Sequence, residues 1–388
     1  MDVDALPDPR PLPTVLQIVP PLDGGGIARA TIDTAAALVA AGGDAIVASP
    51  GGGMAGELRR LKIEHIAMPT DRDGLVAAWR MARALRELLT GRGVSIIHAR
   101  TRTAAWAARK IADEQALKVV ASVHRPGAAE GWTSRWLDAA QARADRVIAV
   151  SDFVARDLRG RHRVPDDRMV TIPAGIALDR FDPATVRAER VIKLAAQWRL
   201  PDDRRIILFP GRLDVDRGQL GLVAALGELG REDVFALLIG AQPQAGPLER
   251  QIKTMVEALG LGGMVAMAPW CEDMPAAYML SDVVVAGGEG EGFSRVMVEA
   301  QAMSRPVVCG AAGGAVEAIL QDVTGWTAPP GVPSALARAL DKALGLSPEQ
   351  RSALSRRARA HVVDKFDVKA MCERTLDVYR ALAPGAAP

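Results

Sequence analysis

The sequence has few cysteines, no long apolar run and almost no net charge. Its three cysteines, Cys271, Cys309 and Cys372, are odd in number and far apart in a chain of 388 residues. Such usage is typical of a reducing compartment, and it disfavours both a disulfide scaffold and a cysteine-bound metal. No run of 18 apolar residues occurs, so we expect no membrane span. Residues 1–14 are acidic and proline-rich, the opposite of a secretory signal peptide.

Phenylalanine and tyrosine are also scarce, with six and two residues. Few rings are therefore available to stack on bases, and no nucleic-acid-binding motif is visible, which disfavours such a partner. The net charge of +2 hides one basic window, because residues 80–163 contain 17 Lys and Arg against 8 Asp and Glu. This window can serve an anionic substrate or a lipid surface, or it can be a set of solvated helix faces.

Short β-branched runs alternate with Ala- and Leu-rich helical stretches along the chain. This rhythm predicts an α/β fold with open parallel sheets, each covered by helices on both faces. We expect buried strands at residues 14–19, 44–49, 95–99, 118–124, 146–151, 204–211, 234–240, 264–268, 282–287 and 305–310.

A segment rich in Pro, Gly and Asp, residues 172–184, interrupts this rhythm before it starts again. The interruption predicts two doubly wound domains, an N-terminal one over 1–185 and a second over 186–365, followed by a C-terminal helical segment over 366–388. Open α/β sheets bind ligands beyond the carboxyl ends of their strands. Two such domains facing across a cleft would suit transfer between two bound molecules.

The first candidate site is the glycine-rich stretch 286–319, which follows an expected strand and opens a helix at Phe293. Backbone N–H groups at a helix start can bind an anion or a hydroxyl group. Glu291 lies before this helix and Glu299 about two turns into it. Each carboxylate has a plainer alternative, since Glu291 could complement the helix dipole and Glu299 could be exposed.

The second candidate site is GRLDVDRG, residues 211–218, between an expected strand and the next helix. Arg212 and Arg217 would bracket the turn, and two guanidinium groups suit a diphosphate because each binds phosphate in bidentate fashion. The alternative is a solvated loop with two ordinary arginines. Neither site matches the Walker A or GxGxxG pattern.

The two stretches together resemble the retaining glycosyltransferases of GT-B architecture, family 4. The GR-L…KG, E-x7-E and PVV…GG…E elements of that family read here as GRLDVDRG, Glu291-x7-Glu299 and PVVCGAAGGAVEAI, residues 306–319. The resemblance begins at VLQIVPPLDGGGIAR, residues 15–29, and covers almost the whole chain. Sequence segments such as DMPAAYMLSDVVV, VEAQAM and RPVV are most similar to those of α-proteobacterial enzymes of lipopolysaccharide and cell-envelope assembly.

The resemblance implies two Rossmann-like domains and a role for each matching residue. Arg212 and Arg217 would neutralise the diphosphate of a nucleotide sugar, Glu299 would bind its ribose, and Glu291 would face its sugar. The N–H groups of Gly292, Phe293 and Ser294 would assist Glu291. His124 would lie near the reacting sugar. Gly25, Gly26 and Gly211 would let the backbone approach the donor. The C-terminal helix would return to the first domain.

Several positions depart from the family pattern. Arg217 replaces a usual Lys, Ser294 a frequent Gly, and Ala174 a frequent Asn, while Gly288-Glu289-Gly290 replaces a Ser/Thr-containing lead. These departures bear on the identity of the donor, for which GDP-mannose and UDP-hexoses are the candidates.

The implied reaction is retaining hexosyl transfer to a lipid-linked or lipopolysaccharide-type saccharide bound by the first domain. The histidines and cysteines show no ligand spacing, so we expect no metal and no cofactor. The alternatives are a UDP-sugar 2-epimerase of the same fold and a non-catalytic nucleotide-sugar-binding component of an envelope assembly complex.

We expect a cytoplasmic protein, and helix 74–90 raises the question of peripheral contact with the inner membrane. Leu75, Trp79, Ala82, Leu85 and Leu89 form one stripe on this helix, with its arginines off the stripe. The stripe could face the protein core, or Arg and Trp together could meet a lipid surface.

Overall fold

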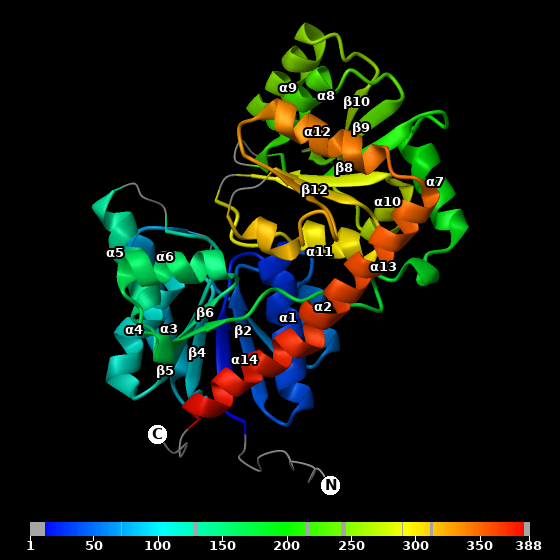
Figure 1. Cartoon of the computed structure of the whole chain (residues 1–388). Helices are drawn as coiled ribbons and strands as arrows, with labels where there is room; N and C mark the ends of the chain where they lie inside the picture. Colours follow the sequence, from blue (N-terminus) through cyan, green and yellow to red (C-terminus); the bar gives the residue numbers. More distant parts are fainter. Residues whose placement is uncertain are drawn as a thin grey trace. The chain divides into compact units, whose positions relative to one another are not determined.

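The computed structural model describes residues 12–70, 72–127, 131–213, 217–241, 246–288, 290–310 and 313–383. Residues 214–216 of the expected phosphate turn, and Glu289 of the glycine-rich turn, lie outside the described residues. The chain divides into two compact units, Met1–Ala174 with Lys369–Pro388, and Gly175–Val368 (Figure 1).

The boundary between the units lies between Ala174 and Gly175. The composition change had predicted it about eleven residues later, after residue 185. The N–H of Ile176 donates to the carbonyl of Phe366 (2.9 Å), and the N–H of Val368 donates to the carbonyl of Ile176 (3.0 Å). Residues from Gly175 onward are thereby tied to the end of the second unit. The C-terminal helix expected over 366–388 is α14, Val368–Leu382. The chain returns to the first unit at Lys369, so residues 366–368 belong to the second unit.

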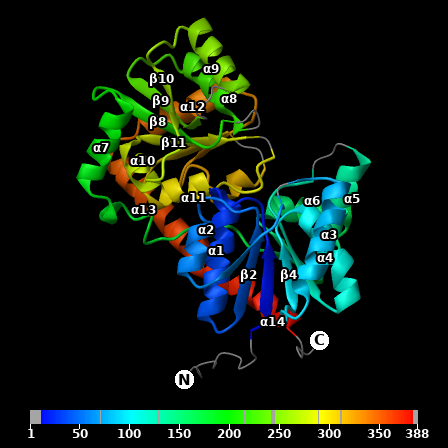
Figure 2. The same ribbon diagram turned by 180° about the vertical axis from the view of Figure 1, so that it is seen from behind.

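The first unit contains a seven-stranded, all-parallel sheet in the order β3-β2-β1-β4-β5-β6-β7. Helices α3 to α6 cover one face of this sheet, and α1, α2 and α14 cover the other (Figure 2). The strands are β1 (Thr14–Ile18), β2 (Asp44–Ser49), β3 (Glu64–Ala67), β4 (Ile96–Ala99), β5 (Lys118–Val123), β6 (Arg146–Ala149) and β7 (Met169–Thr171). The helices are α1 (Gly25–Ala40), α2 (Ala55–Arg60), α3 (Leu75–Leu89), α4 (Arg102–Gln115), α5 (Trp132–Ala142), α6 (Asp152–His162) and α14 (Val368–Leu382).

The second unit contains a six-stranded, all-parallel sheet in the order β10-β9-β8-β11-β12-β13. Its strands are β8 (Arg205–Pro210), β9 (Val234–Ala241), β10 (Val265–Pro269), β11 (Val283–Gly287), β12 (Val307–Gly310) and β13 (Trp326–Ala328). Its helices are α7 (Ala188–Trp198), α8 (Gln219–Leu229), α9 (Pro247–Ala258), α10 (Met274–Leu280), α11 (Arg295–Ala302), α12 (Pro333–Leu344) and α13 (Pro348–Lys365).

Side chains of the second sheet alternate between two apolar layers. Ile206 and Leu208 of β8 belong to the layer that contains α10 and α11. Ile207 and Phe209 belong to the layer that contains α8, α9 and α12. A strand apolar on both faces therefore has helices on both faces. This confirms the predicted α/β architecture of two Rossmann-like parallel-sheet domains.

The sequence did not predict β3, β7 and β13, and each of these strands lies at the edge of its sheet. Edge strands are short and partly exposed, so they lack the continuous apolar run by which the central strands were recognised.

Helix α3 required another correction. Its buried residues are Ala78, Met81, Ala82, Leu85 and Leu89, whereas Trp79 is 57% exposed and lies off the core stripe.

Candidate functional site

The candidate site of the second unit lies where the strand order reverses. Strands β8 and β11 are parallel neighbours, although they are not consecutive in the chain. Arg212 follows the carboxyl end of β8, and Glu291 follows that of β11. The two segments expected to bind one ligand therefore leave the sheet at its topological switch point, the usual ligand position in such folds.

Arg217 and Glu291 form an ion pair at this edge. Nη1 of Arg217 lies 2.8 Å from Oε1 of Glu291, and their side chains are 25% and 17% exposed. The Nε of Arg217 is buried and has no hydrogen-bond partner among the described residues. A partly buried guanidinium with an unused donor can accept a further anion, such as a phosphate.

The third motif of the family resemblance holds the backbone of Glu291. Glu291 forms an isolated parallel bridge with Gly313, and the N–H of Gly314 donates to the Glu291 carbonyl at 2.8 Å. The part of the PVV…GG stretch that follows β12 thus fixes the backbone position of Glu291, which follows β11. Glu291 and Gly313 are 22 positions apart in the chain, and the pairing of β11 with β12 brings them together.

Gly218 allows the β8–α8 turn to pass against the end of β11. Its φ is 85°, and a Cβ built on it would lie 2.5 Å from the carbonyl oxygen of Gly287. The side chain of Gln219 donates to the carbonyl of Arg212 at 2.9 Å. The side chain of Arg212 is exposed at the carboxyl edge of the sheet. Arg212 therefore remains open to solvent, whereas Arg217 is already bonded to Glu291.

Glu299, expected to bind ribose, is held by two side chains that the sequence analysis missed. Its Oε2 accepts a hydrogen bond from the hydroxyl of Tyr278 (2.8 Å), and its Oε1 accepts one from Nη2 of Arg295 (3.2 Å). Burial, together with the carboxylate of Glu299, holds the pKa of Tyr278 well above its usual range. Arg295 could have been found from its i,i+4 spacing to Glu299. Tyr278 could not, because its contact depends on packing between α10 and α11.

The three residues after Glu291 form the turn into α11. This helix begins at Arg295, two residues later than the sequence predicted. Gly292 is buried, and Phe293 packs on Phe366 with ring centroids 5.5 Å apart. Ser294 is 1% exposed, and its hydroxyl has no partner among the described residues. The turn is therefore anchored by Phe293 and carries one unused buried hydroxyl group.

Gly25, Gly26 and His124 lie in the first unit, at the carboxyl edge of its sheet. Gly25 begins α1 with φ 84°, and a Cβ built on it would meet no atom within 4 Å. His124 follows β5, and its Nε2 is buried without a partner among the described residues. Burial, and then the charge of Arg100, lowers the pKa of His124 to about 3. The imidazole is therefore neutral at physiological pH and cannot serve there as a general acid.

The buried guanidinium of Arg100 is a further polar feature that the sequence analysis did not single out. Its Nη2 donates to Oε1 of Gln17 (2.8 Å), and the residue is 6% exposed. Next to it, Nδ1 of His98 lies 2.6 Å from the Tyr379 hydroxyl, and Nε2 lies 2.7 Å from the Ser122 hydroxyl. This chain of contacts ties α14 to β4 and β5.

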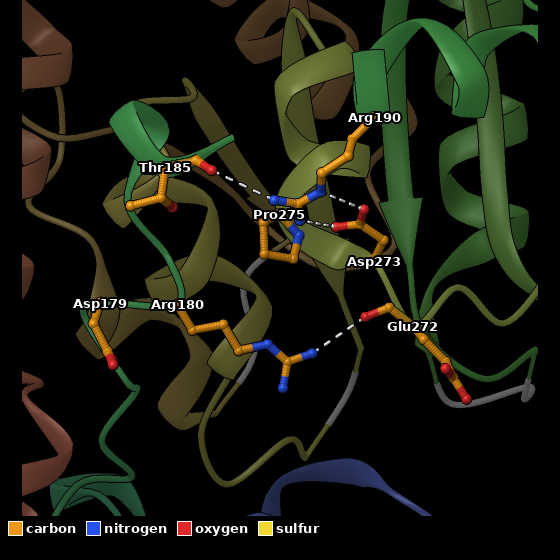
Figure 3. Close-up of a pocket in the computed structure, with 7 residues that line it drawn as sticks. All are labelled: Asp179, Arg180, Thr185, Arg190, Glu272, Asp273 and Pro275. Carbon is orange, nitrogen blue, oxygen red and sulfur yellow. Dashed lines mark hydrogen bonds and ion pairs between the residues drawn. The ribbon is translucent and has the colours of Figure 1, made fainter. Parts of the chain in front are cut away.

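A cavity of about 440 Å³ lies elsewhere in the second unit (Figure 3). Its lining residues are Asp179, Arg180, Thr185, Arg190, Glu272, Asp273 and Pro275. Arg190 binds the carboxylate of Asp273 through Nε (2.9 Å) and Nη2 (2.5 Å), and Arg180 donates to the carbonyl of Glu272 (3.2 Å). The cavity thus lies where the first turn of α7 and the segment before it pack on the start of α10. None of the expected site residues lines it.

Among the described residues, no group of three His, Cys, Asp or Glu side chains is placed to hold a metal ion. No helix in the described part of the chain has the length and apolarity needed to cross a bilayer.

Two family models match the chain. Residues 24–180 match Glycosyltransferase Family 4, and residues 191–361 match Glycosyl transferases group 1. Both halves of the chain are therefore similar to glycosyltransferase domains. The first match includes Gly25, Gly26 and His124, and the second includes both arginines and both glutamates of the candidate site.

Relatives and solved structures agree with these matches. A D-inositol 3-phosphate glycosyltransferase of Kineococcus radiotolerans is 32% identical over 254 residues, which are 61% of this chain and 57% of that protein. The match therefore spans little more than half of the relative. A glycosyltransferase from Rickettsia africae has a TM-score of 0.86 and 28% identity, covering 96% of this chain and 99% of that one. Anabaena Alr3699/HepE, in complex with UDP and glucose, has a TM-score of 0.81 and 20% identity over 95% and 100% of the two chains, and shares the fold.

Proposed function

We propose that the protein is a retaining glycosyltransferase that moves a hexose from a nucleotide sugar to a saccharide acceptor. The observation that carries this proposal is the Arg217–Glu291 pair at the switch point of the second sheet. Arg212 and the Tyr278-held Glu299 lie in adjoining segments, and together these groups offer cations for a diphosphate and carboxylates for hydroxyl groups.

The donor in this proposal is a UDP-hexose or GDP-mannose. Neighbours of the same fold bind UDP and glucose, which favours testing UDP-glucose first. We assign the diphosphate to Arg212 and Arg217, the ribose to Glu299 and the sugar to Glu291. The N–H groups of residues 292–294 would donate to the sugar or its phosphate.

In the proposed reaction, the acceptor hydroxyl oxygen bonds to the anomeric carbon as the bond from that carbon to the diphosphate oxygen breaks. Attack from the face that the diphosphate leaves preserves the configuration, and the acceptor's proton passes to the leaving phosphate. Negative charge grows on that phosphate in the transition state, where fixed guanidinium groups and N–H donors stabilise it. This chemistry needs no nucleophile from the protein and no metal. Neutral His124 would hydrogen-bond a sugar hydroxyl.

The proposed acceptor is a lipid-linked or lipopolysaccharide-type saccharide of the cell envelope, bound by the first unit. The basic window of residues 80–163 supports an anionic acceptor. The Kineococcus relative is named for inositol phosphate, which is also anionic, so an inositol phosphate is a second candidate. With a lipid-linked acceptor, the protein would work in peripheral contact with the cytoplasmic face of the inner membrane.

A panel of UDP-, GDP-, ADP- and CMP-sugars tests the proposal. We expect one donor to raise the melting midpoint and to be consumed only when an acceptor is present. The Glu291→Ala variant should fold and lose transfer. Conversion of UDP-N-acetylglucosamine alone to an epimer would instead establish the 2-epimerase. If Glu291→Ala leaves the cellular glycan unchanged while deletion of the protein alters it, the protein is a non-catalytic binder.

A further inference from the structure

Three tryptophans on neighbouring helices of the first unit form one continuous row. Trp79 on α3 contacts Trp106 on α4, with ring centroids 5.3 Å apart, and Trp106 contacts Trp136 on α5 at 5.1 Å. Trp79 is 57% exposed, Trp136 is 39% exposed and Trp106 is partly buried between them. Val76, one turn before Trp79, is 65% exposed. We call Val76, Trp79, Trp106 and Trp136 the tryptophan row.

The row has a common position in the fold. Each tryptophan is the fifth residue of its helix, since α3 begins at Leu75, α4 at Arg102 and α5 at Trp132. A helix that follows a parallel strand begins at the edge where the strands end. The row therefore lies about one helical turn from the sheet edge that carries Gly25, Gly26 and His124.

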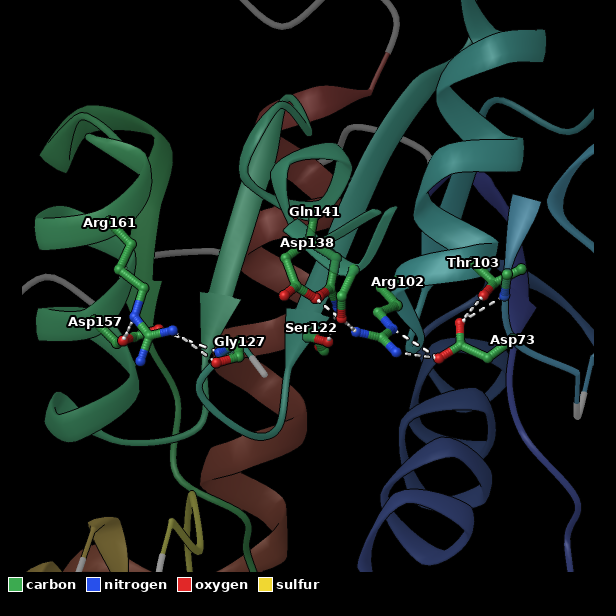
Figure 4. Close-up of polar contacts among 11 residues, drawn as sticks. Asp73, Arg102, Thr103, Ser122, Gly127, Asp138, Gln141, Asp157 and Arg161 are labelled. Atoms are coloured by element: carbon green, nitrogen blue, oxygen red, sulfur yellow. Dashed lines mark hydrogen bonds and ion pairs between the residues drawn. The ribbon is translucent and has the colours of Figure 1, made fainter. Parts of the chain in front are cut away.

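Polar contacts near the starts of α3, α4 and α5 hold these three helices together (Figure 4). Arg102 at the start of α4 donates to Asp73, which precedes α3, and it lies 3.5 Å from Oδ1 of Asp138 on α5. The hydroxyl of Thr103 donates to Oδ1 of Asp73, at 2.5 Å. These contacts fix the rings relative to one another, so the row is present before any partner binds.

Two cations lie at the Trp79 end of the row. Nζ of Lys110 lies 5.1 Å from the ring centroid of Trp79, and Arg80 is exposed on the same helix. Neither Arg80 nor Lys110 forms an ion pair with any residue that the structure describes. By contrast, Arg83 pairs with Glu87, and Arg86 with Glu114. The charge next to the exposed rings is therefore net positive, and its cations are available.

We propose that the tryptophan row, with Arg80 and Lys110, is the surface that docks on an anionic lipid bilayer. Tryptophan favours the headgroup level of a membrane, where its apolar ring is buried and its N–H stays hydrated. Lys and Arg beside it attract anionic headgroups. This inference rests on the proposed membrane contact but not on the proposed donor chemistry. It places a membrane-borne acceptor near the carboxyl edge of the first sheet.

The ring geometry favours lipid over a saccharide chain. A sugar ring stacks on an open, flat aromatic face, whereas these neighbouring rings are tilted by 57° and 40° and contact one another. Lys110 lies over the ring of Trp79. The row thus offers tilted rings that pack on one another, with cations beside Trp79, and these can enter the headgroup region without a defined ring-on-ring fit.

Vesicle sedimentation of the full chain tests the inference, using phosphatidylcholine vesicles with and without phosphatidylglycerol. The wild type should bind only the anionic vesicles and should be released by salt. The Trp79→Ala/Trp136→Ala variant should bind at least about tenfold more weakly. The matched control is Trp270→Ala, which removes a tryptophan that is 54% exposed in the second unit and should bind as wild type does.

A charge variant separates the contribution of the cations. Arg80→Gln/Lys110→Gln should lower affinity for anionic vesicles and reduce its salt dependence. Arg250→Gln/Lys253→Gln, which removes two exposed cations from α9 of the second unit, should change neither. A UDP-induced rise in the melting midpoint that is equal in all variants would show that they are folded.

The outcomes are distinct. If the wild type binds no anionic vesicle, the membrane contact is wrong, and the donor chemistry is unaffected. If it binds but the double tryptophan variant binds equally well, the tryptophan row is not the docking surface. Binding of a soluble oligosaccharide that quenches wild-type tryptophan fluorescence, but not that of the double variant, would make the row a saccharide site and overturn the inference.

Discussion

Nη1 of Arg217 lies 2.8 Å from Oε1 of Glu291, so the cation proposed for the leaving phosphate is bonded to the carboxylate proposed for the sugar. The pair holds both side chains at the switch point in the absence of a ligand. An incoming diphosphate must share the guanidinium with Glu291, while the sugar hydroxyls offer Glu291 new donors. The arrangement therefore favours an intact nucleotide sugar over the free diphosphate.

The Glu291→Gln variant should bind UDP more tightly than the wild type, by about fivefold, because Arg217 is released and a negative charge is removed. Calorimetry with UDP measures this change. In the same assay Glu299→Gln should weaken binding, since the ribose loses its carboxylate. Weaker UDP binding by Glu291→Gln would show that Glu291 orients Arg217 and does not compete with the phosphate.

The Tyr278→Phe variant tests how Glu299 is held. Loss of the hydroxyl leaves Oε2 of Glu299 without its buried donor, so we expect the free energy of unfolding to fall by about 1–3 kcal/mol. Urea denaturation measures this loss. A double-mutant cycle with Glu299→Gln isolates the pair, and full additivity of the two substitutions would mean that the hydrogen bond contributes nothing.

Gly218→Ala should lower the free energy of unfolding by at least about 2 kcal/mol and also weaken UDP binding. The new Cβ would lie 2.5 Å from the Gly287 carbonyl, at a φ of 85° that disfavours L-residues. Gly221→Ala, three residues later and inside α8, is the matched control. Its Cβ would meet no atom within 4 Å, so it should leave stability unchanged or raise it by about 0.5–1 kcal/mol. Equal effects of the two substitutions would contradict the close approach.

Acid should destabilise the first unit. Burial, and then Arg100, lowers the pKa of both His98 and His124 below the ordinary 6.5, that of His124 to about 3. Unfolding lets these rings take up protons, so their contribution is complete above pH 6.5 and is lost as the pH falls toward 3. For His124 the loss between pH 7 and 5 is up to about 2 kcal/mol.

Urea unfolding at pH 7 and 5 measures this dependence. His124→Asn should reduce the difference between the two pH values. A His124→Asn protein with the wild-type pH dependence would show that the ring of His124 is accessible to protons in the folded state.

The central strands and the site glycines could be predicted from the sequence, because their physical signals are local. Strands β1 and β8 are apolar on both faces, and the loops after them carry glycine where the chain must turn tightly. Strands β3, β7 and β13 were missed, since a short strand at a sheet edge needs no continuous apolar run. The domain boundary was misplaced for a related reason. The pairing of Ile176 with the segment after α13 leaves no trace in local composition.

Helix α3 shows where local pattern ends and packing decides. Its apolar residues occupy an arc wide enough to include Trp79, so the sequence placed Trp79 on the apolar stripe and left open whether that stripe faces the core or a lipid surface. The buried arc is instead centred on Ala78, Met81 and Leu85, which leaves Trp79 beside Trp106 and Lys110 at the surface. Which part of an apolar arc is buried depends on the neighbouring helices, and the sequence of one helix does not contain that information.

The sequence by itself determined the α/β architecture, the two domains and the motif residues of the candidate site, because hydrophobic periodicity, glycine turns and charged residue types are all local properties. Only the tertiary structure decided that Arg217 bonds Glu291, that Tyr278 and Arg295 hold Glu299, that His98 meets Tyr379, and that three tryptophans form one exposed row. Each of these relationships joins residues on different turns or elements. Their distances are set by strand order and helix packing, which no local pattern specifies.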